Sequence, residues 1–197
     1  MGTKGAATRA RILDGARELL EVHGYSGTGL NQVLAASGAP RGSLYFHFPG
    51  GKDELVTAAL EAAGAEIDAL AREISAGAAD AVGLVQGVID LFANRMEASD
   101  FTRGCPVAAT ALDAAATNDT VYAACRRAYA SWHRTLAERL AAEGRTPEAA
   151  GADAWAALSL LEGALLLARA TRDRAPLDHA RNTVTRLLGE ARPPEAG

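Results

Sequence analysis

A short run of polar and aromatic residues at positions 41–48 has the composition of a surface that contacts nucleic acid. At helical spacing, Leu44, Phe48 and part of Phe46 form an apolar side that can pack on a protein core. Gly42 leaves the start of the segment bare, so that its backbone can approach a phosphate or a base edge. The outward polar and aromatic side presents Arg41, Ser43, Tyr45 and His47.

Two earlier helices are expected to hold this segment in place. Apolar residues recur at helical spacing over residues 8–23, and Gly24 can end that helix in the left-handed conformation. Thr28 is a candidate N-cap for a second short helix that reaches Ser37, and Pro40 suits the start of the third. Three short helices with a tight turn between the last two match the plan of a helix-turn-helix.

The rest of the chain is expected to be helical as well. A long helix over residues 52–76 would connect the head to the body, and no segment alternates in the manner of a strand. The further helices are expected over residues 82–98, 107–117, 118–143, 147–171 and 176–189. We predict an all-α fold of about nine helices, with a three-helix DNA-binding domain at residues 1–52 and a second helical domain at residues 53–197.

Charge and composition fit such an organisation. Residues 1–52 carry six basic and three acidic side chains, whereas residues 53–197 carry 14 and 21. A positive head on an acidic body suits a protein that meets a polyanion at one end, although chance clustering on a solvated surface explains the charge equally well. The longest apolar stretch, residues 154–168, is shorter than a membrane span of about 20 residues. We expect a cytoplasmic protein with no signal segment, membrane span, metal or cofactor.

Residues 24–55 resemble the N-terminal domain of the TetR/AcrR family of transcriptional regulators. The resemblance is carried by Asn-Gln-Val-Leu-Ala-Ala-Ser-Gly-Ala-Pro at residues 31–40, Gly-Ser-Leu-Tyr-Phe-His-Phe at residues 42–48 and Lys-Asp-Glu-Leu at residues 52–55. The Gly-Cys-Pro loop at residues 104–106 resembles the LmrA/YxaF-like subgroup. The N-terminal match covers roughly residues 8–60. The resemblance implies that residues 53–197 form a ligand-binding and dimerisation domain.

This resemblance implies DNA contacts for a set of eight residues. Tyr45, His47 and Lys52 would contact phosphates, with Lys52 at a helix N-terminus. Arg41 would read a base edge, with guanine as the expected partner. The secondary candidates are Thr28, Gln32, Gly42 and Ser43. Two positions depart from the family: Gly29 stands where many relatives carry a hydroxyl, and the linker before Lys52 is one residue longer than usual.

The nearly all-round apolar helix over residues 154–168 is expected to be buried on two faces. The resemblance implies that it pairs with the last helix in a four-helix dimer interface, whereas a fully internal helix in a monomer is the alternative. The candidate interface residues are Leu158, Leu161, Leu165, Val184, Leu187 and Leu188.

Glu162 lies inside that apolar helix and therefore needs a partner. The partner is either an arginine such as Arg169 or a ligand in a pocket. Six other candidates for a ligand pocket lie on the central helices or the loop between them, although apolar side chains at helical spacing are more often ordinary core. They are Phe92, Met96, Phe101, Cys105, Trp132 and Trp155.

These observations predict a sequence-specific transcriptional regulator. We expect a homodimeric repressor that binds a pseudo-palindromic operator and is released by a small, mostly apolar effector. A transcriptional activator, or a ligand-binding or protein-interaction module that has lost DNA binding, is the alternative. The sequence contains no G-x-S-x-G, H-E-x-x-H or complete phosphate-binding loop, so we do not expect an enzyme.

Overall fold

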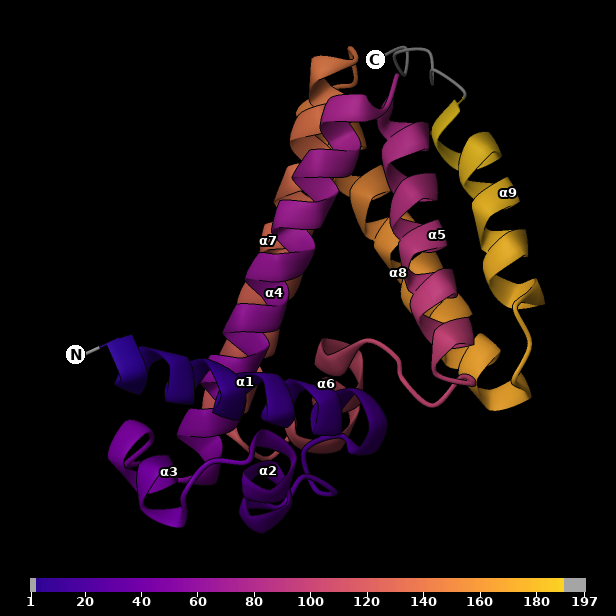
Figure 1. Ribbon diagram of the computed structural model, residues 1–197. Helices are drawn as coiled ribbons and strands as arrows, with labels where there is room; N and C mark the ends of the chain where they lie inside the picture. Colours follow the sequence, from indigo (N-terminus) through magenta and orange to yellow (C-terminus); the bar gives the residue numbers. More distant parts are fainter. Residues whose placement is uncertain (1–2, 190–197) are drawn as a thin grey trace. The chain divides into compact units, whose positions relative to one another are not determined.

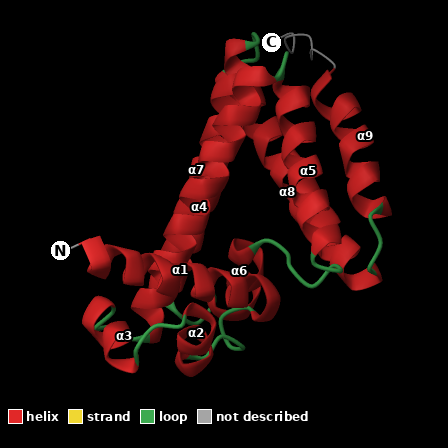
Figure 2. Cartoon of the chain, viewed as in Figure 1, coloured by secondary structure: helices red, strands yellow, loops and turns green. Residues whose placement is uncertain are grey.

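The computed structural model describes residues 3–189, and within that range the chain forms nine α-helices and no strand (Figures 1 and 2). The predicted all-α fold is thereby confirmed. The helices are α1 (Thr3–His23), α2 (Leu30–Ser37), α3 (Arg41–His47), α4 (Lys52–Gly77), α5 (Ala81–Ala98), α6 (Pro106–Ala114), α7 (Asp119–Ala142), α8 (Pro147–Thr171) and α9 (Ala175–Gly189).

The start of α2 corrects one prediction. Gly29, and not Thr28, is the N-cap of α2, and its N–H donates to Oε1 of Gln32 at 2.8 Å. The hydroxyl of Thr28 is turned inward and donates to the carbonyl of Gly24 at 2.7 Å. Thr28 therefore closes the turn after α1 instead of capping the next helix.

Packing divides the chain into two compact units. One comprises the residues up to Glu66 together with Arg103–Tyr129, and the other comprises Ile67–Thr102 and the residues from Ala130 onward. The helices α4 and α7 contribute to both units. The predicted domain boundary at residue 52 stays a prediction. In the packing, α6 and the start of α7 belong to the same unit as α1, α2 and α3.

In the first unit, α1 packs on α2, α3 and α6 (Figure 1). The core includes Ile12 and Leu20 of α1, Val33 of α2 and Leu44 of α3, all with no exposed surface, and Phe48 is 1% exposed. Removing one such side chain from water contributes about 1.5–3 kcal/mol. Apolar burial therefore fixes the three short helices to one another.

In the second unit, α5, α8 and α9 lie side by side (Figure 1). Gly87 of α5 permits a close approach to α4, since a Cβ there would lie 2.6 Å from Cγ2 of Ile74. By length and composition alone, α8 could cross a membrane, and 39% of its most apolar window is buried. Its buried side packs against α5 and α9, whereas Leu166 and Leu167 are exposed on the other side.

A buried ion pair joins three segments of the second unit. Arg145, in the loop between α7 and α8, donates from Nε to Oδ2 of Asp153 at 2.9 Å and also donates to the carbonyl of Leu188 in α9. The side chains of Arg145 and Asp153 are only 12% and 8% exposed. Each charge therefore depends on the other for its compensation.

Asp153→Ala is expected to lower the free energy of unfolding by about 3–5 kcal/mol, because it leaves a guanidinium buried without its carboxylate. Urea denaturation measures the change. The control is Arg127→Ala, which breaks an exposed pair with Glu61 and should cost about 1 kcal/mol or less. Equal losses for the two variants would contradict the role assigned to the buried pair.

Candidate functional site

The two sides of α3 separate in part as predicted. Leu44 and Phe48 are buried, whereas Arg41 is exposed and Tyr45 is 62% exposed. Phe46 corrects the expectation that it shares the anchoring side, because it is 74% exposed. Phe46 follows Leu44 by two residues, so helical geometry places the Phe46 side chain on the opposite face of α3. The Phe46 ring meets the His47 ring edge-on, with 5.0 Å between the ring centroids. The exposed side of α3 is thus polar and aromatic.

The beginning of α3 is open on its outer side. Gly38 ends α2 with a φ of 60°, and Pro40 is the N-cap of α3, whose carbonyl accepts from the N–H of Ser43 at 2.9 Å. A Cβ added at Gly42 would meet no protein atom within 4 Å. The packing of the protein itself does not demand glycine there, and the missing side chain leaves room for another molecule.

Lys52, the first residue of α4, stands over an aromatic ring. Its Nζ lies 4.3 Å from the centroid of the Tyr25 ring. The hydroxyl of Tyr25 donates to Oδ1 of Asp53 at 2.5 Å, and this hydrogen bond raises the pKa of Tyr25 and lowers the pKa of Asp53. The chain after α1 is thereby tied to the start of α4.

A second tie holds the same loop to α6. The backbone N–H and the hydroxyl of Ser26 donate to the two carboxylate oxygens of Asp113, at 2.5 and 2.7 Å. These hydrogen bonds lower the pKa of Asp113. A Cβ at Gly24, where φ is 65°, would lie 3.2 Å from Oδ2 of Asp113. Sequence reasoning missed Asp113, because its partner lies 87 residues away and neither belongs to a motif.

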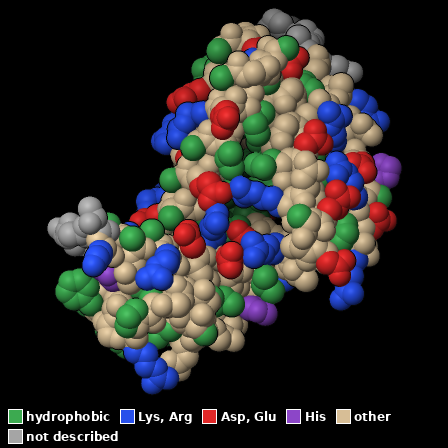
Figure 3. Space-filling model, in the orientation of Figure 1, with side chains coloured by type: hydrophobic (Ala, Val, Ile, Leu, Met, Phe, Trp, Pro, Cys, Tyr) green, Lys and Arg blue, Asp and Glu red, His purple; other side chains and the backbone are tan. Residues whose placement is uncertain are grey.

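The remaining predicted DNA-contacting residues differ in accessibility. Gln32 is exposed on α2, and Ser43, His47 and Lys52 are half-buried. Thr28 is only 2% exposed and its hydroxyl is engaged with Gly24. Figure 3 shows basic side chains spread over the surface where Figure 1 places α1 and α3. The accessible candidates therefore belong to α2, α3 and the start of α4, without Thr28.

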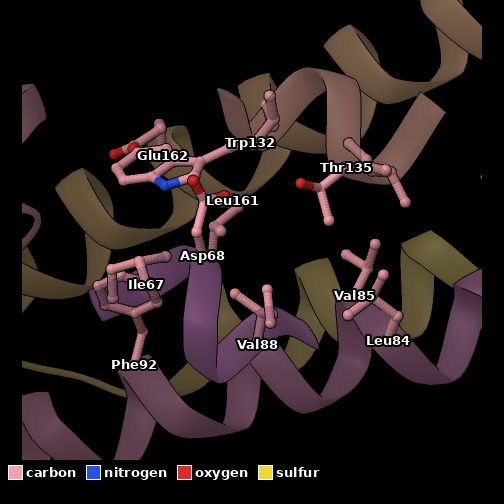
Figure 4. Close-up of a pocket in the computed structure, with 14 residues that line it drawn as sticks. Ile67, Asp68, Leu84, Val85, Val88, Phe92, Trp132, Thr135, Leu161 and Glu162 are labelled. Carbon is pink, nitrogen blue, oxygen red and sulfur yellow. The ribbon is translucent and has the colours of Figure 1, made fainter. Parts of the chain in front are cut away.

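The second unit contains a partly open cavity of about 60 Å³ (Figure 4). Three of the seven predicted pocket residues line it, namely Phe92, Trp132 and Glu162. Its other walls come from α4, α5, α7 and α8. They are Ile67, Asp68, Ala71, Leu84, Val85, Val88, Thr135, Leu136, Ala157, Leu158 and Leu161.

Four predicted pocket residues do not line this cavity. Met96 is 1% exposed in the core, and Phe101 lies in the loop after α5 with a φ of 55°. Cys105 belongs to the other unit, where its Sγ accepts from the N–H of Ala108 at the start of α6. Trp155 is 49% exposed and stacks on His133, with 4.4 Å between the ring centroids. Helical spacing alone could not distinguish pocket residues from residues of the core, of a helix cap or of the surface.

The predicted dimer residues fall mostly on the inner sides of α8 and α9. Leu161, Leu165, Val184 and Leu188 are buried within the protomer, and Leu158 lines the cavity. The outer side instead carries a shallow groove between the two helices, lined mainly by small and apolar residues. They are Ser159, Leu160, Gly163, Ala164, Leu167, Thr171, Asp173, Ala175, Pro176, His179, Ala180 and Thr183.

The family comparison agrees with this geometry at both ends of the chain. Residues 12–59 match the model described as bacterial regulatory proteins of the tetR family. Residues 81–183 match the C-terminal domain of LmrA/YxaF-like transcriptional regulators. Each match falls on a different part of the chain, so both the helix-turn-helix and the later helices have family counterparts.

Relatives extend the similarity over nearly the whole chain. An HTH-type transcriptional regulator of Mycobacterium tuberculosis is 36% identical over 185 residues, which cover 91% of this chain and 93% of the relative. The HTH-type transcriptional regulator LmrA of Bacillus subtilis is 30% identical, with 92% and 96% covered. A TetR regulator structure from Legionella pneumophila is similar in fold, with a TM-score of 0.83, 24% identity and coverage of 95% and 98%.

Acidification is expected to weaken the tie between Ser26 and Asp113. Because folding lowers the pKa of Asp113 below its ordinary value of 3.8, its stabilisation is present above that pH and is lost as the pH falls through the folded pKa. Asp113→Ala should lower the urea midpoint at neutral pH. The difference in urea midpoint between this variant and the unmodified protein should become smaller below about pH 3.8.

The matched control is Asp14→Ala, which removes an exposed carboxylate of α1. It should change the urea midpoint little at either pH. A gap for Asp113→Ala that is as wide in acid as at neutral pH would show that the lost stability does not come from the ionised carboxylate.

Proposed function

Because this chain belongs to the TetR family of transcriptional regulators, we propose that it is a homodimeric repressor that a small, mostly apolar effector releases from its operator. It acts in the cytoplasm on double-stranded DNA. The observation that carries the proposal is α3, whose apolar side is buried at Leu44 and Phe48 while its polar side is exposed. The relatives it matches are regulators and not enzymes.

The exposed side chains of α3 divide into two roles. Arg41 is exposed at the start of the helix, where a guanidinium can donate two hydrogen bonds to O6 and N7 of guanine. Tyr45 and His47 follow on the same helix and contact phosphates, which position the helix without reading the sequence. Gln32 and Ser43 provide further polar contacts, and the bare surface at Gly42 admits the DNA.

Lys52 adds a phosphate contact at the N-terminus of α4, which is 26 residues long. The ammonium of Lys52 lies over the Tyr25 ring, and this contact holds it in place for a phosphate. The helix dipole and the lysine charge both favour an anion there.

A second copy of the chain covers the outer sides of α8 and α9. Leu166 and Leu167 are 57% and 56% exposed on α8, and the groove between α8 and α9 has mainly apolar walls. Such a surface is costly in water and fits an isologous contact around a two-fold axis. Two copies of α3 would then meet successive major grooves about 34–36 Å apart on a pseudo-palindrome.

The effector occupies the cavity of the second unit. Ile67, Asp68 and Ala71 of α4 line that cavity, and the same continuous helix begins at Lys52. An effector lifts repression only if it binds the DNA-incompetent state more tightly than the DNA-bound state. We propose α4 as the element through which that difference is transmitted.

Selection from random duplexes tests the proposed function. The protein should enrich a pseudo-palindrome, and its affinity should fall by about 10³–10⁵ between 50 and 200 mM salt if six to ten phosphates are contacted. A protein-interaction module that has lost DNA binding would enrich no sequence and show no such salt dependence. An activator would enrich a palindrome equally well and differs only in the position of its operator relative to the promoter.

Arg41→Ala should weaken binding to the enriched sequence by about 1–3 kcal/mol and relax the preference at one base pair of each half-site. Titrations on the enriched duplex and on single-base variants measure both effects. Tyr45→Phe is the matched control, since loss of a phosphate contact should weaken binding to all duplexes alike. If Arg41→Ala also weakened all duplexes equally, Arg41 would be a phosphate contact instead.

Leu167→Glu is expected to convert the dimer into a monomer, because it places a charge in the apolar contact between two copies. Sedimentation equilibrium gives the mass directly. Leu112→Glu is the control, since Leu112 is 79% exposed on α6, outside α8 and α9. A Leu167→Glu protein that remains dimeric would place the interface elsewhere.

A further inference from the structure

The cavity of the second unit combines apolar walls with two acidic side chains. Asp68 of α4 and Glu162 of α8 are its only charged lining residues, and none of the lining residues is basic. In Figure 4 both lie toward the end of the cavity that holds Trp132, whereas Leu84, Val85 and Thr135 lie toward the other end. Both carboxylates therefore lie toward one end of a cavity whose walls are otherwise mainly apolar.

Asp68 leaves one carboxylate oxygen unsatisfied. The residue is 7% exposed, and its Oδ2 accepts a hydrogen bond from the Ser131 hydroxyl at 2.5 Å. Its Oδ1 is buried and has no hydrogen-bond partner among the described residues. A buried acceptor without a donor destabilises the folded protein, and more so when it is charged. A ligand that brings a donor to Oδ1 recovers that free energy.

The walls beside the carboxylates favour a positive charge. Trp132 and Phe92 both line the cavity, and aromatic faces attract cations within about 6 Å of their centroids. An anionic ligand would meet two carboxylates with no basic lining residue to offset them. A neutral apolar ligand would fill the space but would leave Oδ1 of Asp68 without a donor.

We propose that this cavity binds a protonated amine joined to a compact apolar body. The ammonium donates to Oδ1 of Asp68, beside the Trp132 ring, and the apolar part lies against Leu84, Val85 and Val88. This inference rests on the proposed role of the cavity as the effector site and names the chemical class of the effector. A cavity of about 60 Å³ favours a small molecule and requires the aliphatic walls to move for a larger one.

The test compares probes that differ in charge at nearly constant shape. Benzylamine, protonated at neutral pH, and ethylbenzene have the same number of non-hydrogen atoms, and benzyl alcohol supplies a neutral donor. Trp155→Phe leaves Trp132 as the one tryptophan, so that its fluorescence reports binding in the cavity. Benzylamine should bind about tenfold or more tighter than ethylbenzene, with benzyl alcohol between them.

Two variants assign the selectivity to a single side chain. Asp68→Asn keeps the shape but removes the charge, and it should weaken benzylamine binding about tenfold or more while ethylbenzene changes less than about twofold. Asp80→Asn is the control: Asp80 caps α5 through Gly83 at 2.8 Å, away from the cavity, and asparagine caps equally well. It should leave the affinity for both probes unchanged.

Three outcomes would overturn the inference. The first is equal affinity of the unmodified cavity for benzylamine and ethylbenzene, and the second is no binding of benzylamine. The third is an equal loss of affinity for both probes in Asp68→Asn. The first two need no variant, so a failure of Asp68→Asn to fold does not protect the inference. Duplex binding by the same proteins is measured without probe, so that a loss of DNA recognition refutes the proposed regulator separately from the amine site.

Discussion

The burial of Leu44 and Phe48 is the interaction on which the site depends. A helix of seven residues is too short to be stable alone, so α3 exists because these two side chains are held in the core formed with α1 and α2. Once they are buried, Tyr45 and Phe46, one and two positions after Leu44, are turned toward solvent, and Arg41 is exposed at the first position of the helix. The same contact thus forms the helix and aims its polar side.

Hydrogen bonds from the loop after α1 tie it to α4 and α6. Tyr25 binds Asp53 at the start of α4, and Ser26 binds Asp113 of α6. The loop therefore joins α1, α4 and α6 within one compact unit. These ties matter for the proposed function, because the proposed phosphate contact at Lys52 would position α3 only if both share one rigid frame.

Local patterns predicted the helices and the two sides of α3 from sequence, because both follow from the spacing of residues within a single helix. They could not predict contacts between distant segments. The all-round apolar α8 has no preferred face by composition, so Leu161 and Leu165 were assigned to the dimer although they are buried in the protomer. Asp68 was missed altogether, since a lone carboxylate on a helix is usually solvated and only the packing of four helices encloses it.

Amide chemical-shift mapping of the isotope-labelled protein with an enriched duplex shows whether the anchored α3 presents its exposed side to DNA. We expect the largest changes on residues 41–47 and at Lys52, while contacts from the Leu44 and Phe48 side chains to α1 persist. Changes concentrated on other helices, with residues 41–47 unaffected, would contradict it. So would loss of the Leu44 and Phe48 contacts on binding, because the anchored side of α3 would then not be what presents the polar side to DNA.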